Sequence, residues 1–165
     1  MDEKTPSSSP SSSRKWKHDV FLSFRGEDTC KNFTNHLYAI LKQKSIITFR
    51  ADKNLKRGEP ISPELLKAIE ESMFAVVILS ENYAFSTWCL DELVKIMECK
   101  KEMGQTVLPI FYDVDPSEVR KQTGTYAQAF DEHEKHFEEN IDKVHTWKAT
   151  LTKVTSLSGF PLQDR

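Results

Sequence analysis

Short apolar runs alternate along this chain with longer stretches in which apolar residues recur every three or four positions. The runs are rich in aliphatic and β-branched residues and predict strands, whereas the longer spacing predicts helices that each bury one stripe. The predicted strands are residues 19–24, 46–49, 74–79, 106–112 and 159–162. The predicted helices are residues 31–44, 63–73, 86–97, 126–139 and 141–156.

Three of these elements and two connecting segments lead to more detailed expectations. Residues 74–79 are apolar throughout, which predicts a strand buried on both faces. Pro109 lies within the fourth predicted strand and indicates an edge position or a bulge there. Residues 50–61 and 113–124 are polar and are expected to form long loops. The helix before the third strand is expected to bury Leu65, Leu66, Ile69 and Met73.

The alternation of strands and helices indicates an α/β fold. We expect a flavodoxin-like, three-layer architecture in which about five parallel strands, in the order 2-1-3-4-5, carry helices on both faces. In this order the first and third strands are neighbours, and the direction of winding reverses between them. Ligands of open α/β sheets usually bind at such a point, beside the carboxyl ends of the strands.

Three side chains are expected to meet at this point. Arg25 follows the first strand, while Trp88 and Glu92 lie near the start of the helix that follows the third strand. Because Trp88 and Glu92 are four positions apart, the indole and the carboxylate share one face of that helix. The sequence therefore predicts a cleft that holds an arginine, an indole and a carboxylate.

Composition limits the classes of function. The chain has 165 residues, 38% hydrophobic and 29% charged, which suits one globular domain. The net charge of −2 argues against nucleic acid as a partner. No apolar run reaches the ~20 residues that span a bilayer, so no membrane partner is expected. Three cysteines without metal-ligand spacing indicate a reduced compartment, cytoplasmic or nuclear. Residues 1–17 are rich in Ser and are expected to be a disordered leader.

Four segments resemble motifs of plant TIR domains, the signalling modules at the N-terminus of intracellular immune receptors. These segments are DVFLSFRGEDT at residues 19–29, RGEPISPELLKAIEES at 57–72, SENYAFSTWCLDEL at 80–93 and PIFYDVDPSEVRKQTG at 109–124. Several long motifs in one order are far more specific than any single motif. The resemblance leads us to expect a TIR domain over residues 18–163 that lacks the last helix of the family.

The resemblance implies an NAD+ nucleosidase that is activated by self-association and acts in plant innate immune signalling and cell death. NAD+ or NADP+ would be its substrate, and no cofactor is implied. By position, the catalytic glutamate of the family is Glu92. The implied substrate-binding residues are Arg25, Gly26, Arg57, Ser80 and Trp88.

The resemblance also implies homotypic contacts between TIR domains, from dimers to tetramers. It assigns Asn35, His36 and Gly124 to self-association. The chain departs from the family pattern at Asn35, where serine is frequent, and at Cys30, where arginine is common. The alternative function is a non-catalytic interaction module that signals only through contacts between TIR domains.

Some candidate residues also have structural interpretations. Glu92 would be a solvated side chain or would pair with Lys95, three positions further along the helix. Cys89 follows the apolar stripe of the same helix and is expected in the core rather than as a nucleophile.

No metal site is expected. His133 and His136 are better explained by a polar helix face than by metal binding. The acidic residues Asp113, Asp115 and Glu118 lack the glycine and the spacing of a calcium loop, so a turn and a helix cap explain them better.

Overall fold

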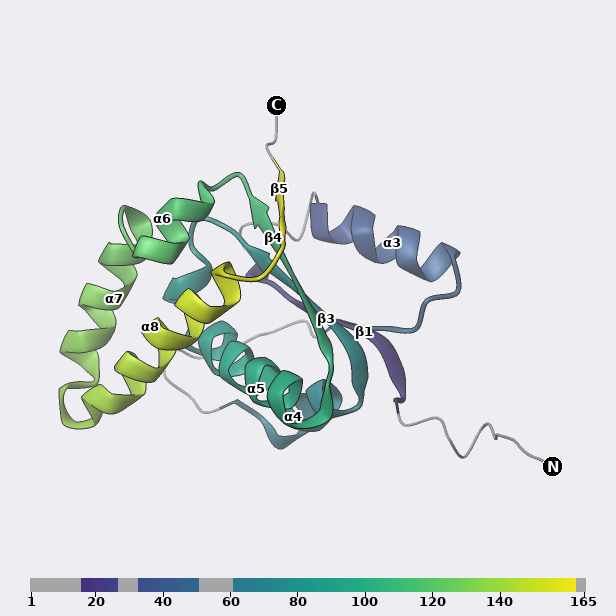
Figure 1. The fold of residues 1–165 in the computed structure, drawn as a ribbon, viewed down its shortest axis with the longest axis horizontal. Coiled ribbons are helices and arrows are strands. Elements are labelled where there is room, and N and C mark those ends of the chain that lie inside the picture. The colour runs from purple at the N-terminus through teal and green to yellow at the C-terminus, as the bar shows by residue number, and fades with distance from the viewer. Residues whose placement is uncertain (1–15, 27–32, 51–60, 163–165) are drawn as a thin grey trace.

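The computed structural model describes residues 16–26, 33–50 and 61–162, and Figure 1 shows how they are arranged. The sheet has five parallel strands in the order β2-β1-β3-β4-β5. The strands are β1 (His18–Ser23), β2 (Thr48–Arg50), β3 (Ser72–Leu79), β4 (Thr106–Tyr112) and β5 (Phe160–Leu162). The flavodoxin-like order predicted from the sequence is confirmed, including the adjacency of β1 and β3.

The helices form the two outer layers of the fold (Figure 1). The α-helices are α3 (Asn35–Gln43), α4 (Pro63–Glu70), α5 (Thr87–Met103), α6 (Pro116–Lys121), α7 (Thr125–His136) and α8 (Ile141–Thr155). In the part of the chain that the structure describes, two short 3-10 helices, η2 (Tyr83–Phe85) and η3 (Glu138–Asn140), lie in the connections. Within the described ranges, no helix has the length and apolar content needed to cross a membrane.

Each face of the sheet contributes to its own hydrophobic core, as strand alternation requires. Val20, Leu22, Val76 and Ile78 pack on the side of α3, against residues such as Leu37. On the other face, Phe21, Val77 and Leu79 pack against apolar residues of α4, α5, α7 and α8. The chain is therefore a three-layer α/β domain whose larger core lies on the face opposite α3.

Serine caps begin the two helices that flank β3. The Ser62 hydroxyl accepts a hydrogen bond from the Leu65 amide at 3.3 Å, and Pro63 occupies the first turn of α4. Ser86 is the cap of α5, and its hydroxyl accepts a hydrogen bond from the Cys89 amide at 3.1 Å. These caps fix the residues at which α4 and α5 begin. Helix α5 therefore starts close to the carboxyl end of β3.

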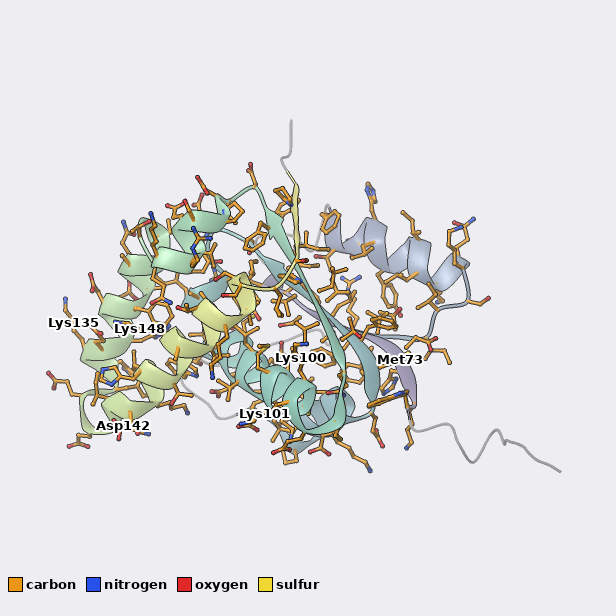
Figure 2. All side chains as sticks on the ribbon, in the orientation of Figure 1. Met73, Lys100, Lys101, Lys135, Asp142 and Lys148 are labelled. Carbon is orange, nitrogen blue, oxygen red and sulfur yellow. The ribbon has the colours of Figure 1, made fainter. Side chains whose placement is uncertain are left out.

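The structure corrects three sequence expectations. Met73 belongs to β3 rather than to the preceding helix and is 37% exposed (Figure 2). Phe74, at the same end of the strand, is 40% exposed, so β3 is buried on both faces only in its carboxyl half. Helix α6 occupies part of the region expected to be a loop, because the Asp115 carboxylate accepts from the Ser117 amide at 2.9 Å and caps a short helix.

Pro109 lies in β4 between two neighbouring strands, so its predicted edge position is only partly correct. It is aligned with Val77 of β3, but the register with β5 begins one residue later, at Ile110. Proline lacks an N–H donor, and this part of β4 has no partner strand on the β5 side. Most of the predicted leader and residues 51–60 of the predicted loop lie outside the described residues.

Candidate functional site

Glu92 lies in the second turn of α5 with its side chain 0% exposed. Ser23, the last residue of β1, donates a hydrogen bond of 2.8 Å from Oγ to Glu92 Oε1. This contact joins residues 69 positions apart, and it follows from the adjacency of β1 and β3, because α5 begins just beyond the carboxyl end of β3. The carboxylate therefore lies at the strand ends where the sequence predicted a ligand site.

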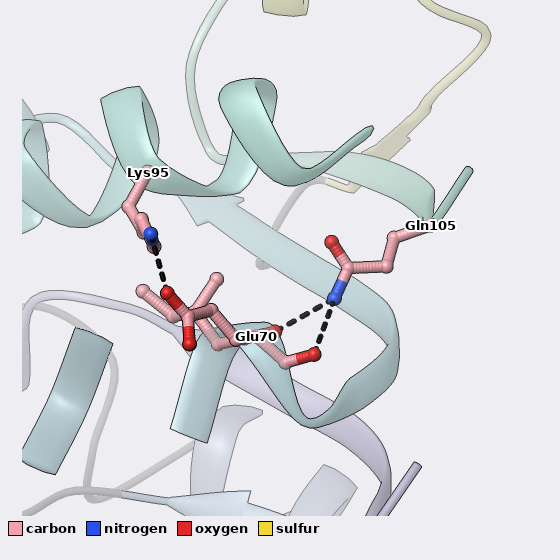
Figure 3. A network of polar contacts seen from close by, with 4 residues as sticks. Glu70, Lys95 and Gln105 are labelled. Carbon is pink, nitrogen blue, oxygen red and sulfur yellow. Dashed lines mark hydrogen bonds and ion pairs between the residues drawn. The ribbon is translucent and has the colours of Figure 1, made fainter. Parts of the chain in front are cut away.

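The surface interpretation of Glu92 is wrong. Its side chain is buried, and Lys95 pairs instead with Glu70 of α4, at 2.7 Å between Nζ and Oε2 (Figure 3). Carboxylates are rarely fully buried unless hydrogen bonds or charges compensate them. The burial of Glu92 is therefore a feature that calls for a chemical explanation.

Tyr83 extends the polar contacts of Glu92. Its hydroxyl is 2.7 Å from Ser23 Oγ and lies 3.1 Å from the carbonyl oxygen of Cys89, to which it can donate. Burial raises the pKa of the Tyr83 hydroxyl well above its ordinary value of 10.0, and the nearby Cys89 and Glu92 raise it further. The phenol therefore stays protonated and remains a donor. The sequence did not single out Tyr83, although it lies inside the motif at residues 80–93.

Trp88 lies one turn before Glu92 and is 8% exposed. Its ring belongs to the larger core, yet its buried Nε1 has no hydrogen-bond partner within the ranges that the structure covers. Buried indole N–H groups usually have a partner. The side chain thus combines a packing role with a donor that a ligand could use.

The other predicted substrate-binding residues lie at the same end of the sheet where the structure describes them. Arg25 is half-buried and Gly26 is exposed, two and three positions beyond Ser23. Ser80 directly follows β3 and is buried. Arg57 lies outside the described residues.

A comparison with protein-family models decides the family, because the model for the TIR domain matches residues 17–164. The chain belongs to the TIR domain family. It is 57% identical to TMV resistance protein N of Nicotiana glutinosa over 151 residues and 59% identical to disease resistance protein RUN1 of Vitis rotundifolia over 159 residues. These alignments cover 92% and 94% of the chain but only 13% and 12% of the relatives.

Solved structures agree with this assignment. The TIR domains of the activated Roq1 resistosome, which directly recognises the pathogen effector XopQ, match with a TM-score of 0.80 and 57% identity. The alignment covers 88% of each chain. This TIR domain therefore shares its fold with that of a protein solved in an activated assembly.

Side chains of α7 hold the loop that connects β3 to α5 in this TIR domain. Tyr126 Oη donates to the Ser80 carbonyl at 2.6 Å, and Thr125 Oγ1 donates to the Glu81 carbonyl at 2.8 Å. His133 Nε2 donates to the Ala84 carbonyl at 2.7 Å, because a carbonyl oxygen can only accept. The backbone beside the candidate site is thus fixed from a helix distant in sequence.

The polar-face interpretation of His133 is wrong. The imidazole is 1% exposed and contacts the rings of Phe130, Phe137 and Trp147. By contrast, His136 is exposed. The sequence gives a signal for this difference, because His133 continues the helical spacing of the apolar positions in α7.

The predicted self-association residues of the TIR domain lie in two places. Asn35 and His36 are exposed in the first turn of α3, whereas Gly124 precedes α7 on the opposite face of the sheet (Figure 1). Asn35 and His36 therefore lie on the other face of the sheet from α5, which carries Glu92, whereas Gly124 lies on the same face as α5. Cys30 lies outside the described residues.

Three further features of the domain concern a cysteine, metal binding and a pocket. Cys89 is buried and its thiol donates to the Phe24 carbonyl at 3.4 Å, which confirms the predicted core role. No group of three His, Cys, Asp or Glu side chains that could hold a metal ion occurs in the described part of the chain. A pocket of about 340 Å³ lies at the amino end of β2, lined by Tyr38, Lys42, Ser45, Ile46, Ile47 and Thr48, and contains no predicted site residue.

Proposed function

We propose that this TIR domain cleaves the N-glycosidic bond between nicotinamide and ribose in NAD+ or NADP+, and that Glu92 is its catalytic residue. The observation that carries the proposal is a fully buried carboxylate at the carboxyl ends of β1 and β3, held by a hydrogen bond of 2.8 Å from Ser23. Buried acids at the switch point of an α/β sheet are candidates for catalysis.

The chemistry of the substrate suits one carboxylate. The nicotinamide ring carries a positive charge and leaves as a neutral molecule, so the reaction requires no strong general acid. The difficult species is the ribosyl cation that develops as the C–N bond breaks. A fixed carboxylate stabilises such a cation or holds the ribose hydroxyls, as glycosidase carboxylates do. Glu92 would have this role.

The neighbours of Glu92 supply contacts for the rest of the dinucleotide. The Trp88 indole can stack on an adenine or nicotinamide ring, worth about 0.5–1.5 kcal/mol beyond area burial. The Arg25 guanidinium can hold a phosphate in bidentate fashion. Gly26, Ser80 and Arg57 complete the proposed substrate-binding residues.

Complete burial of Glu92 has a consequence for activity. A substrate carbon cannot reach a carboxylate that is 0% exposed, so the single chain must rearrange before it can react. We propose that self-association stabilises the open form, with Asn35, His36 and Gly124 at the contacts between TIR domains. Any partner that binds only one conformation shifts the population toward it. The similarity to TIR domains of an activated resistosome supports this gating.

The relatives suggest the setting in which this activity would act. The chain matches short parts of disease resistance proteins, as their names state. We therefore propose a role in plant innate immune signalling and cell death, in the cytoplasm or the nucleus. Since the chain spans only 13% and 12% of two of these proteins, the role of any longer protein that contains it is part of this proposal.

The test is NAD+ consumption as a function of protein concentration. We expect a steep dependence on concentration for the wild-type chain and loss of turnover in Glu92→Gln, which keeps the volume of the side chain. Glu98→Gln is a matched control on the exposed side of α5 and should keep wild-type turnover.

The same experiment distinguishes the alternative function. The burial of Glu92 in the single chain also fits a module that signals only through contacts between TIR domains. In that case NAD+ stays intact even when light scattering shows that the protein has assembled. Retained turnover in Glu92→Gln would instead show that another residue carries the chemistry.

A further inference from the structure

Glu92, Ser23 and Tyr83 form one continuous line of polar contacts inside the domain. Ser23 Oγ is 2.8 Å from Glu92 Oε1 and 2.7 Å from Tyr83 Oη, which in turn lies 3.1 Å from the Cys89 carbonyl oxygen. The side chains of all three residues are 0% exposed. They come from β1, η2 and α5, so the line connects the end of the sheet with both segments that follow β3.

The number of hydrogens in this line depends on the charge of Glu92. Three contacts join the four groups, and each hydroxyl supplies one hydrogen. When Glu92 is ionised, Ser23 donates to the carboxylate and Tyr83 donates to Ser23 across the shorter of its two contacts. The single hydroxyl hydrogen of Tyr83 is then used in the bond to Ser23, so the contact between Tyr83 and the Cys89 carbonyl contains no hydrogen.

Protonation of Glu92 reverses the direction of donation. The carboxylic acid donates to Ser23 Oγ, the Ser23 hydroxyl turns to donate to Tyr83 Oη, and the Tyr83 hydroxyl donates to the Cys89 carbonyl. All three contacts then contain one hydrogen each. Only two hydroxyl rotations are needed, and no heavy atom has to move. A buried carboxyl group can thus change its charge without losing its hydrogen bond to Ser23.

We propose that Ser23 and Tyr83 are positioning residues that hold Glu92 and adjust to both of its protonation states during the reaction. The inference rests on the proposed function. As the C–N bond breaks, nicotinamide leaves with the bonding electron pair, and the oxygen of a water molecule bonds to the ribose carbon. The proton that this water loses passes to Glu92, which later releases it to solvent, so one NAD+ and one water give nicotinamide, ADP-ribose and one proton.

Neither residue touches the substrate in this mechanism, so activity alone does not test the proposal. The decisive measurement is the pKa of Glu92, followed by the chemical shift of its ¹³Cδ carbon in NMR titrations, with Glu92→Gln used to assign the signal. In Ser23→Ala both forms of Glu92 lose a hydrogen bond, but the bond to the charged carboxylate is the stronger one, so the pKa of Glu92 should rise by about 1 unit. Ser23→Thr keeps the hydroxyl and should restore the wild-type value.

Tyr83→Phe provides a second test that keeps the ring in the core. The variant removes the contacts of Tyr83 with Ser23 and with the Cys89 carbonyl, but it leaves the hydrogen bond between Ser23 and Glu92 in place. The pKa of Glu92 should therefore change less than in Ser23→Ala. Turnover of NAD+ should fall between about tenfold and 100-fold in both variants, with KM nearly unchanged, because the two residues position the acid and do not bind the substrate.

Ser72→Ala is the matched control for Ser23→Ala. Ser72 is also a buried strand serine whose Oγ makes one hydrogen bond, 2.7 Å to the Ala68 carbonyl, but it lies at the opposite end of the sheet. Its removal should leave the pKa of Glu92 and the turnover unchanged.

The outcomes separate the two proposals. A folded Ser23→Ala protein in which the pKa of Glu92 equals the wild-type value would overturn the positioning role. If Ser23→Ala does not fold, a wild-type pKa of Glu92 in Tyr83→Phe together with unchanged turnover would overturn it. Absence of NAD+ consumption by the assembled wild-type chain would overturn the proposed function, whereas the NMR titration would still report on the contacts of Glu92.

Discussion

The Tyr126 hydroxyl of α7 donates a hydrogen bond of 2.6 Å to the carbonyl oxygen of Ser80, the residue that directly follows β3. Both side chains are buried, so this bond is shielded from water. It is one of the buried contacts through which α7 holds the loop before α5. The position of Trp88 and Glu92 therefore depends on a helix that begins more than 30 residues further along the chain.

Tyr126→Phe should lower the free energy of unfolding by about 1–2 kcal/mol, because a buried carbonyl loses a donor that water cannot replace. Urea denaturation followed by tryptophan fluorescence measures the change. Thr125→Val removes the neighbouring bond to Glu81, which is exposed, and should cost less than about 0.5 kcal/mol. Equal losses in the two variants would contradict the argument from burial.

The arrangement of strands could be predicted from the sequence because the strands are short, strongly apolar and separated by amphipathic helices. This pattern leaves few ways to bury both faces of a parallel sheet. The exposure of Met73 and Phe74, near the start of β3, does not follow from this pattern. Their apolar character predicts burial, but burial depends on which helices cover that end of the sheet, and the pattern does not contain this information.

The candidate site was predictable only in part. Trp88 and Glu92 share one helix, so their spacing alone places them on one face. Ser23 and Tyr83 reach Glu92 through the packing of separate segments, and no local pattern distinguishes them from other serines and tyrosines. The charged neighbours of His133 in sequence predict a polar face, but its spacing with the apolar positions of α7 is the signal that agrees with its burial.

Gln105 connects the end of α4 with the start of β4 (Figure 3). Its Nε2 donates to the carbonyls of Ile69 at 2.8 Å and Ser72 at 2.7 Å, and lies 3.3 Å from that of Glu70. The last carbonyls of a helix have no partner within the helix, so this amide acts as a cap. Gln105→Leu should destabilise the domain by about 2–3 kcal/mol in chemical denaturation.

A surface glutamine provides the comparison for Gln105. Gln128 is exposed on α7, and Gln128→Leu should change the free energy of unfolding by less than about 0.5 kcal/mol. If Gln105→Leu lowered the free energy of unfolding as little as Gln128→Leu, the hydrogen bonds of Gln105 would contribute no more to stability than the apolar contacts of a leucine. The capping role of Gln105 would then be minor.

Tyr83 predicts a specific dependence of stability on alkaline pH. Burial raises the pKa of its hydroxyl well above 10.0 in the folded state. Between the unfolded and the folded pKa, the folded state binds more protons than the unfolded state, so stability falls as pH rises. The contribution is complete below about pH 10 and is lost above it.

Tyr83→Phe removes this titration. Urea denaturation at intervals from pH 8 to pH 11 should therefore show a shallower loss of stability for the variant than for the wild-type domain. The variant will be less stable at pH 8 because it lacks two hydrogen-bond contacts, so the comparison concerns the slope and not the absolute value. Parallel curves for the two proteins would contradict the assignment of the alkaline loss to Tyr83.

Two glycines with positive φ differ in what surrounds them. Gly104 ends α5 at φ 76° and ψ 21°, with no atom near the position of a Cβ, so Gly104→Ala should cost only the strain of the left-handed region, about 1–2 kcal/mol. Gly124 has φ 60° and ψ −131°, a conformation that residues other than glycine avoid, and a Cβ there would collide with the Glu118 carboxylate.

Gly124→Ala should therefore destabilise the domain more than Gly104→Ala, by about 2–4 kcal/mol, mainly through backbone strain and to a lesser extent because the flexible Glu118 side chain must move away. Thermal unfolding of the two variants measures the difference. The double variant Gly124→Ala with Glu118→Ala removes the collision and keeps the strain, so it should recover part of the loss relative to Glu118→Ala alone. Equal stability of the two alanine variants would mean that the backbone before α7 rearranges to accept a side chain at position 124. The conformation of Gly124 would then not be needed to place α7 against the loop beside Glu92.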